Sequence, residues 1–159
     1  MIENDERYME EALLEAHKSD LIGEVPIGAV IVHNGKIVGR GHNLREHSQQ
    51  ACDHAEVMAI SDANRTLRSW RLVDCTLYVT LEPCIMCSGA IVNSRIDRVV
   101  FGARDPKAGA VASLYGLLND ARLNHQVEVE EGVLADQAAM MLKRFFKAAR
   151  KRNKQRKQQ

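Results

Sequence analysis

The chain has 159 residues, of which 45% are hydrophobic and 27% charged, and its formal net charge at pH 7 is +1. This length and apolar content suit one domain with a substantial core. No stretch approaches the ~20 apolar residues needed to cross a bilayer, and the acidic first residues lack the apolar centre of a signal peptide. We therefore expect a cytoplasmic protein without membrane contact.

The small net charge conceals an uneven distribution. Nine of the 22 Lys and Arg residues lie between Lys143 and Gln159, a segment without Asp or Glu, and the preceding residues are acidic overall. Such a segment is either a solvated helix end or a contact for a polyanion, of which nucleic acid is the commonest. We expect one domain at 1–150, followed by a basic tail at 151–159.

Apolar periodicity and turn signals predict an alternating order of helices and strands. The chain begins with a helix at 5–19, and Asn34-Gly35 between two apolar runs then predicts a hairpin. In chain order, the later expectations are a helix at 54–67, a strand at 75–80, a helix at 84–94, strands at 98–102 and 127–130, and a helix from 135. This order predicts an α/β fold of three layers, with a mixed sheet of about five strands between helices.

Two short motifs carry the residues with the clearest chemistry. His54-Ala55-Glu56 and Pro83-Cys84-Ile85-Met86-Cys87 supply one imidazole and two thiols, which are typical zinc ligands. Three protein ligands leave the fourth position of a tetrahedral zinc for water, as in catalytic sites, and zinc lowers the pKa of that water to about 7. Glu56 would then be free to move protons. This spacing is the signature of zinc nucleobase deaminases.

Each motif also has a less specific interpretation. A Cys-x-x-Cys pair alone can be a redox dithiol or half of a structural zinc site. Pro83 suits the first turn of a helix, which would place Cys84 and Cys87 one turn apart near its amino terminus and favour their thiolates. Asp53 and Glu56 could instead form a capping box for the helix near His54.

The remaining cysteines, histidines and large apolar residues show no comparable spacing. Cys52 and Cys75 are interpreted as small buried residues, although Cys52 is close enough to His54 to be an outside candidate ligand. The Met140-Met141 and Phe145-Phe146 pairs of the last helix are interpreted as core. The other histidines are expected to be ordinary surface or partly buried residues, namely His17, His33, His42 and His47, with His125 kept for the reason below.

The chain resembles the bacterial tRNA-specific adenosine deaminases of the cytidine deaminase superfamily over residues 5–150. The zinc motifs mark the superfamily. The stretches 94–102, 105–109 and 124–125 and the basic final helix are similar to the tRNA enzymes. Cys52-Asp53 departs from the small or apolar residues that usually precede the metal His in this family. The stretches that carry the resemblance are 23–30, 41–43, 54–56, 81–90, 94–102, 105–109 and 124–125.

The resemblance implies a cytidine deaminase-like fold that converts the wobble adenosine of a tRNA anticodon to inosine by hydrolysis. It assigns one zinc per subunit to His54, Cys84 and Cys87, proton transfer to Glu56, a homodimeric state and no organic cofactor. Its implied substrate contacts are Glu24, Val25, Pro26, Ile27, Asn43, Ala55, Asp105, Lys107, Asn124, His125, Phe145, Phe146 and Arg150. The alternatives are a free-base or nucleoside deaminase, which has little use for a basic arm, and a zinc-stabilised RNA-binding module, which can dispense with Glu56.

Overall fold

A five-stranded sheet forms the centre of the computed structural model, which describes residues 2–158. The strands are β1 (Gly28–His33), β2 (Lys36–His42), β3 (Cys75–Leu81), β4 (Arg98–Ala103) and β5 (Glu128–Glu131). Their order is β2-β1-β3-β4-β5; β1 is antiparallel to β2 and to β3, and β3, β4 and β5 are parallel. The mixed sheet and the hairpin at Asn34-Gly35 confirm the predicted α/β fold.

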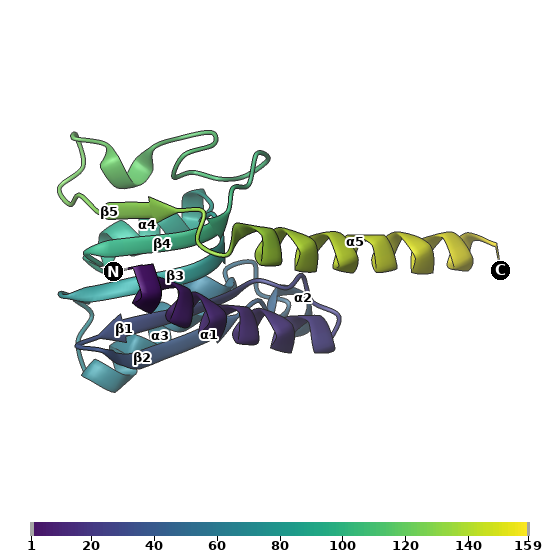
Figure 1. Cartoon of the computed structure of the whole chain (residues 1–159), viewed down its shortest axis with the longest axis horizontal. Helices are drawn as coiled ribbons and strands as arrows, with labels where there is room; N and C mark the ends of the chain where they lie inside the picture. Colours follow the sequence, from purple (N-terminus) through teal and green to yellow (C-terminus); the bar gives the residue numbers. More distant parts are fainter. Residues whose placement is uncertain (1, 159) are drawn as a thin grey trace.

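Helices cover both faces of the sheet (Figure 1). The two terminal helices, α1 (Ile2–Leu21) and α5 (Ala135–Lys157), lie on one face, and α3 (Ala55–Leu67) and α4 (Ile85–Asn93) lie on the other. The short helix α2 (Arg45–Ser48) and the 3-10 turn η1 (Leu117–Asn119) were not predicted, because each contains too few residues to show a period. None of the described helices is both long and apolar enough to cross a bilayer.

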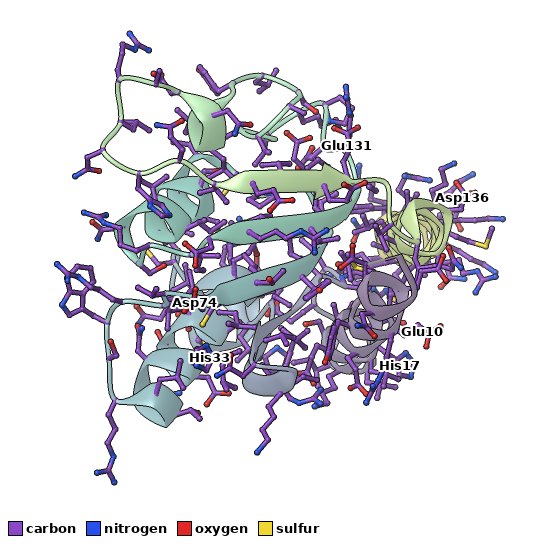
Figure 2. All side chains as sticks on the ribbon, turned by 60° about the vertical axis from the view of Figure 1, so that its left-hand side comes forward. Glu10, His17, His33, Asp74, Glu131 and Asp136 are labelled. Carbon is purple, nitrogen blue, oxygen red and sulfur yellow. The ribbon has the colours of Figure 1, made fainter. Side chains whose placement is uncertain are left out.

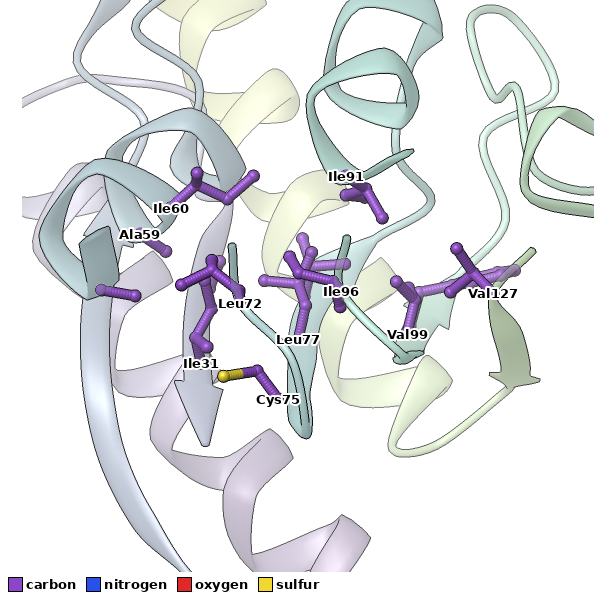
Figure 3. Packing of buried hydrophobic residues seen from close by; sticks show 14 of the residues in the cluster. Ile31, Ala59, Ile60, Leu72, Cys75, Leu77, Ile91, Ile96, Val99 and Val127 are labelled. Carbon is purple, nitrogen blue, oxygen red and sulfur yellow. The ribbon is translucent and has the colours of Figure 1, made fainter. Parts of the chain in front are cut away.

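Strand β1 is buried on both of its sides because successive side chains alternate between the two faces of the sheet. Ala29 and Ile31 pack into the larger core beneath α3 and α4, while Val30 and Val32 pack against α1. Figure 3 shows the larger core, in which Ile31, Ile60, Leu72, Leu77, Ile91 and Ile96 interlock between the helices and the sheet. Each such side chain contributes about 1.5–3 kcal/mol when fully buried.

The contact between β2 and α3 is close enough to require glycine. A Cβ atom on Gly41 would lie 2.3 Å from the carbonyl oxygen of Ala55, the first residue of α3. Helix α3 therefore rests directly on the backbone of β2 at its amino-terminal end. This contact fixes the position of His54 and Glu56, which flank Ala55 in the sequence.

An ion pair between the partly exposed Arg98 and the buried Asp5 joins α1 to the amino-terminal end of β4. The guanidinium of Arg98 donates two hydrogen bonds of 2.8 Å to Asp5, and the Tyr78 hydroxyl donates a third of 2.9 Å. The hydrogen bonds from Arg98 lower the pKa of Asp5 below its ordinary value of 3.8. The outer side of α1 carries polar residues, and Glu10 and His17 lie there (Figure 2).

Helix α5 differs from its predicted role. It crosses residue 150 without a break and continues to Lys157, and Ala138 is its one buried residue within the described chain. Met140 and Phe146 are 52% and 44% exposed, so the interpretation of the Met and Phe pairs as core was wrong. A helix of this length spans about 34 Å, whereas a six-residue strand spans about 20 Å. The sheet can therefore cover only its first turns, and the rest projects from the body (Figure 1).

Candidate active site

The zinc-type ligands come together at the edge of the sheet where β3 and β4 end. His54 is the N-cap residue of α3, Cys84 is the N-cap residue of α4, and Cys87 lies in the first turn of α4. Neither N-cap side chain bonds to its own helix, so both are available for a ligand. Because Cys84 is the N-cap of α4, Pro83 precedes this helix. The prediction that Pro83 lies in its first turn was wrong.

The distances within this group fit a zinc ion. The Nδ1 atom of His54 lies 3.6 Å from the Sγ atoms of both Cys84 and Cys87. Tetrahedral bonds of about 2.0 Å to nitrogen and 2.3 Å to sulfur require a nitrogen–sulfur separation of about 3.5 Å, close to the two distances observed. Within residues 2–158, these three form the one metal-capable group of His, Cys, Asp and Glu side chains. Cys52 is exposed and does not belong to it.

The two thiols have different acidities. A hydrogen bond from Cys87 lowers the pKa of Cys84 to about 4, and His54 adds to the effect. The same contact, together with burial, raises the pKa of Cys87 above its ordinary value. A metal binds cysteine as the thiolate. Cys84 is already the thiolate at neutral pH, whereas Cys87 has to release its proton when the metal binds.

Glu56 lies in the first turn of α3, beside His54, and is 4% exposed. Burial raises the pKa of this carboxyl group to about 7. The alternative interpretation, a capping box of Asp53 and Glu56, does not hold, because the N-cap of α3 is His54 and not Asp53. Glu56 is therefore a buried carboxyl group that no cap contact holds, and it can carry a proton near neutral pH.

A cavity of about 780 Å³ opens above this group. Its walls combine α3, the ends of β3 and β4, and one side of α5. Seven of the residues expected to contact substrate line this cavity: Val25, Ile27, Asn43, Ala55, Asp105, Lys107 and Phe146. Besides His54, Cys84 and Glu56, the remaining lining residues were not among the expected contacts: Arg45, Leu81, Glu82, Arg104, Pro106, Ala108, Leu142 and Lys143.

Some expected contact residues lie behind the cavity wall. Glu24 is 1% exposed, and its carboxylate accepts a hydrogen bond of 3.0 Å from the backbone N–H of Glu46. Asn43 lines the cavity, but its side chain also donates to the carbonyl oxygen of Val25 and accepts from the backbone N–H of Arg45. These contacts hold the wall together. Pro26 is buried, and Phe145 and Arg150 lie on α5 outside the cavity.

Asn124 and His125 do not come near the cavity in this chain. The Nε2 atom of His125 lies 2.7 Å from the carbonyl oxygen of Ile96, which precedes β4. The cavity lies at the other end of this strand, beside Arg104. Both residues lie away from the cavity of their own chain, because the chain after Asp105 returns to the opposite edge of the sheet before it reaches them. Their contacts with substrate stay a prediction.

Glu82, at the end of β3, holds the segment 105–113 against the site. This carboxyl group is 2% exposed and accepts hydrogen bonds from that segment. Burial acts to raise its pKa, but the hydrogen bonds from Ser113, Ala112 and Asp105 outweigh it and lower the pKa to about 2. Glu82 is therefore charged at neutral pH, and its negative charge is fully engaged by the loop.

The mouth of the cavity carries positive charge. Arg45, Lys107 and Lys143 are exposed cavity residues, and none forms a salt bridge with any residue in the described part of the chain. Arg104 also lines the mouth but is paired with Glu131 at 2.9 Å. Three cations without acidic partners favour an anionic group at the entrance, above the buried carboxyl group and the ligand set.

The chain matches known proteins over almost its whole length. Residues 2–103 match the cytidine and deoxycytidylate deaminase zinc-binding region. The chain is 54% identical over 150 residues to a tRNA-specific adenosine deaminase of Bacillus subtilis (strain 168), with 94% of this chain and 93% of that protein covered. A tRNA-specific adenosine deaminase of Streptococcus pyogenes serotype M1 is also 54% identical, over 96% of this chain and 90% of that protein.

A solved structure agrees with these relatives. It comes from a study of A-to-I editing by tRNA:A34 deaminases at the wobble position of transfer RNA. It is 40% identical to this chain, covers 86% of this chain and 99% of its own, and superposes with a TM-score of 0.82. The matched zinc-binding region contains His54, Glu56, Cys84 and Cys87. The chain therefore belongs to the tRNA-specific adenosine deaminases, a family built on the cytidine and deoxycytidylate deaminase zinc-binding region.

Proposed function

We propose that the chain converts the wobble adenosine of a tRNA anticodon loop to inosine, with zinc held by His54, Cys84 and Cys87. The observation that carries this proposal is the buried Glu56 carboxyl group beside the ligand set, at the base of a cavity with a cationic mouth. Zinc supplies the Lewis acidity that makes water a nucleophile at neutral pH.

Glu56 is the proposed proton carrier. It accepts the proton that the attacking water releases and donates it to the ring nitrogen next to the carbon that bears the amino group. It then takes the proton of the hydroxyl group that the attack has added to the ring carbon and passes it to the amino group, so that the carbonyl forms as the carbon–nitrogen bond breaks and ammonia leaves. A general acid–base group needs a pKa near the working pH, and burial brings the pKa of Glu56 to about 7.

The cavity is suited to an extruded base. Its volume of about 780 Å³ is within the usual range for a small-molecule site. A base stacked in a helix hides its reacting carbon, so the enzyme needs a nucleotide that can leave its stack, as in a hairpin loop. Val25 and Ile27 provide apolar wall for the base, and Asn43 provides an amide beside it.

The cations favour a polynucleotide over a free base. Arg45, Lys107 and Lys143 lie at the mouth, where the phosphates on either side of an extruded nucleotide would pass. Helix α5 continues from Lys143 with eight further Lys and Arg residues. A free base carries no phosphate and would gain nothing from these charges.

The deciding experiment compares substrates. Purified protein is incubated with an anticodon stem-loop that contains a wobble adenosine, and with free adenosine, guanine and cytidine. We expect inosine in the stem-loop and far lower kcat/KM for the free compounds, with a stem-loop carrying guanosine at the wobble position as the control. Comparable efficiency on a free base would favour a small-molecule deaminase. Stem-loop binding without turnover of any compound would favour a zinc-stabilised RNA-binding module.

We also propose that the protein acts as a homodimer in the cytoplasm, where tRNA is found. Ile85, Leu114 and Tyr115 are each more than half exposed, and a second copy could bury side chains of this kind. Sedimentation velocity at several protein concentrations tests this, and a monomer at all of them would contradict it.

A further inference from the structure

One carboxylate holds the two ends of the loop that borders the cavity. Oε1 of Glu82 accepts hydrogen bonds from the backbone N–H of Asp105, at 3.0 Å, and from the hydroxyl of Ser113. Oε2 accepts three backbone N–H groups, those of Val111, Ala112 and Ser113, at 3.1, 2.8 and 2.9 Å. Four backbone donors of a single loop therefore depend on one buried side chain.

The loop lies directly against this carboxylate. A Cβ atom on Gly109 would be 2.3 Å from Cδ of Glu82 and as close to both carboxylate oxygens. No side chain fits between them, so the contact requires glycine. The backbone N–H of Ala110 also donates to the carbonyl oxygen of Pro83, at 2.9 Å. The middle of the loop is thus fixed to the same short stretch that carries Cys84.

The first part of this loop forms the cavity mouth. Residues 105–108 all line the cavity, and they include the exposed cation Lys107. Oδ1 of Asp105 accepts hydrogen bonds from the backbone N–H groups of Lys107 and Ala108, at 3.1 and 3.3 Å. This turn is therefore internally braced, and its position relative to the zinc-type ligands depends on the contacts of Glu82.

We propose that Glu82 is a positioning residue for substrate: through its hydrogen bonds to the loop 105–113, it sets the placement of the 105–108 turn and hence the affinity for the part of the substrate outside the reacting base. This inference rests on the proposed function for the identity of that substrate. The ligand set is held separately, by α3 and α4. Loss of the Glu82 contacts should therefore raise KM for an RNA stem-loop more than it lowers kcat.

Three variants test the contact from different sides. Glu82→Gln replaces one acceptor oxygen with an NH₂ donor. Because both oxygens of Glu82 accept hydrogen bonds from the loop, the new NH₂ group faces an N–H donor whichever way the amide is turned. Gly109→Ala displaces the carboxylate without changing its charge. Ser113→Ala removes only one hydroxyl donor. Asp5→Asn is the control, because it removes a buried carboxylate that lies far from the cavity in an ion pair of similar burial.

The measurements are KM and kcat for the stem-loop, zinc content, and amide hydrogen exchange over 105–113. We expect Glu82→Gln and Gly109→Ala to raise KM by about tenfold or more, with kcat within about threefold of the parent. Ser113→Ala should have a smaller effect in the same direction. Zinc should remain at one per chain, exchange protection should fall at residues 111–113, and Asp5→Asn should change none of these.

Two results would overturn the proposal. Unchanged exchange protection at 111–113 in Glu82→Gln would show that the carboxylate does not hold the loop. If Glu82→Gln loses exchange protection at 111–113 but its KM for the stem-loop is unchanged, the loop does not position substrate. A fall in kcat without a rise in KM would show the same. If Glu82→Gln does not fold, Gly109→Ala and Ser113→Ala decide by the same readouts. A parent protein that neither binds nor deaminates the stem-loop refutes the proposed function instead, and KM for its actual substrate then decides the role of Glu82.

Discussion

Helix α5 should contact RNA along one side only. Leu142, Lys143 and Phe146 of this helix line the cavity. Residues seven apart in an α-helix lie within about 20° of one another around its axis. Arg150 and Lys157 therefore continue the line that begins at Lys143.

The spacing gives the size of the effect. Seven Lys and Arg residues follow Phe146 in the chain, and if all of them met phosphates, the log–log salt dependence of binding would include about −5 from this segment. Lys147, Arg150, Lys154 and Lys157 all lie within about 40° of Lys143 around the axis, and Arg150 and Lys157 are the two that repeat its position at seven-residue intervals. Replacing both with Gln should therefore make the slope less negative by about 1.4, at about 0.7 for each phosphate contact on a single strand.

The chain offers a matched control. Arg144 and Lys151 are also seven residues apart and exposed, but they lie about 140–160° around the helix from Phe146. Their double replacement with Gln removes the same charge from positions about 100–140° around the helix from Arg150 and Lys157. Binding of a labelled stem-loop is measured by fluorescence anisotropy over a series of salt concentrations, with all proteins at full length. Equal changes of slope in the two pairs would show that the helix attracts RNA only through its net charge, and no change in either would identify α5 as a solvated helix.

Glu56→Gln should lower turnover of the stem-loop by about 100-fold or more while zinc stays at one per chain by atomic absorption; loss of zinc would instead make Glu56 a ligand or a structural residue. Asp5→Asn removes the close partner of Arg98, which keeps only Glu128 at 3.8 Å, and should lower the free energy of unfolding by about 1.5–3 kcal/mol in urea titrations. The pKa of Asp5 lies below its ordinary value of 3.8, so the ionised carboxylate stabilises the fold fully above about pH 4, and this stabilisation is lost as the pH falls further. The parent should therefore lose stability in acid more steeply than Asp5→Asn. Parallel curves of unfolding free energy against pH would contradict this. Gly41→Ala should cost about 1–3 kcal/mol, because its Cβ would meet the backbone of α3. Gly89→Ala, on the open side of α4, should instead stabilise by about 0.5–1 kcal/mol, and equal effects of the two would refute the close contact.

Local spacing was enough to predict the ligand set and most of the elements. His54 and Glu56 are two residues apart, Cys84 and Cys87 are one helical turn apart, and each motif begins a helix. The sheet brings the two helix starts together because β2, which precedes α3, and β3, which precedes α4, are both antiparallel to β1 and therefore end at the same edge. Motifs of this kind are visible in a sequence because each is complete within a few residues.

The rest of the cavity depends on contacts between distant segments. Arg45 follows the hairpin and Lys143 belongs to α5, and nothing in their own surroundings indicates that they share a cavity mouth. His125 shows the opposite case, since its place near the turn-rich loop in the sequence does not bring it near the cavity. The Met and Phe pairs of α5 failed as core predictions because an amphipathic pattern does not reveal where the sheet beneath it ends.

Rigidity and specificity are provided by different parts of this fold. Strand β3 is paired on both sides and is largely buried, and its end leads directly to Glu82 and Cys84. Side chains attached to such a strand hold their positions well, which precise metal and proton chemistry requires. The 105–113 loop and α5 border the same cavity but are less firmly attached than β3: four backbone N–H groups of the loop bond to the one carboxylate of Glu82, and α5 has a single buried residue. Changes in these two outer segments can therefore alter which nucleic acid is bound while the zinc-type ligands and Glu56 stay in place, and this predicts that substrate range and zinc affinity respond to different sets of substitutions.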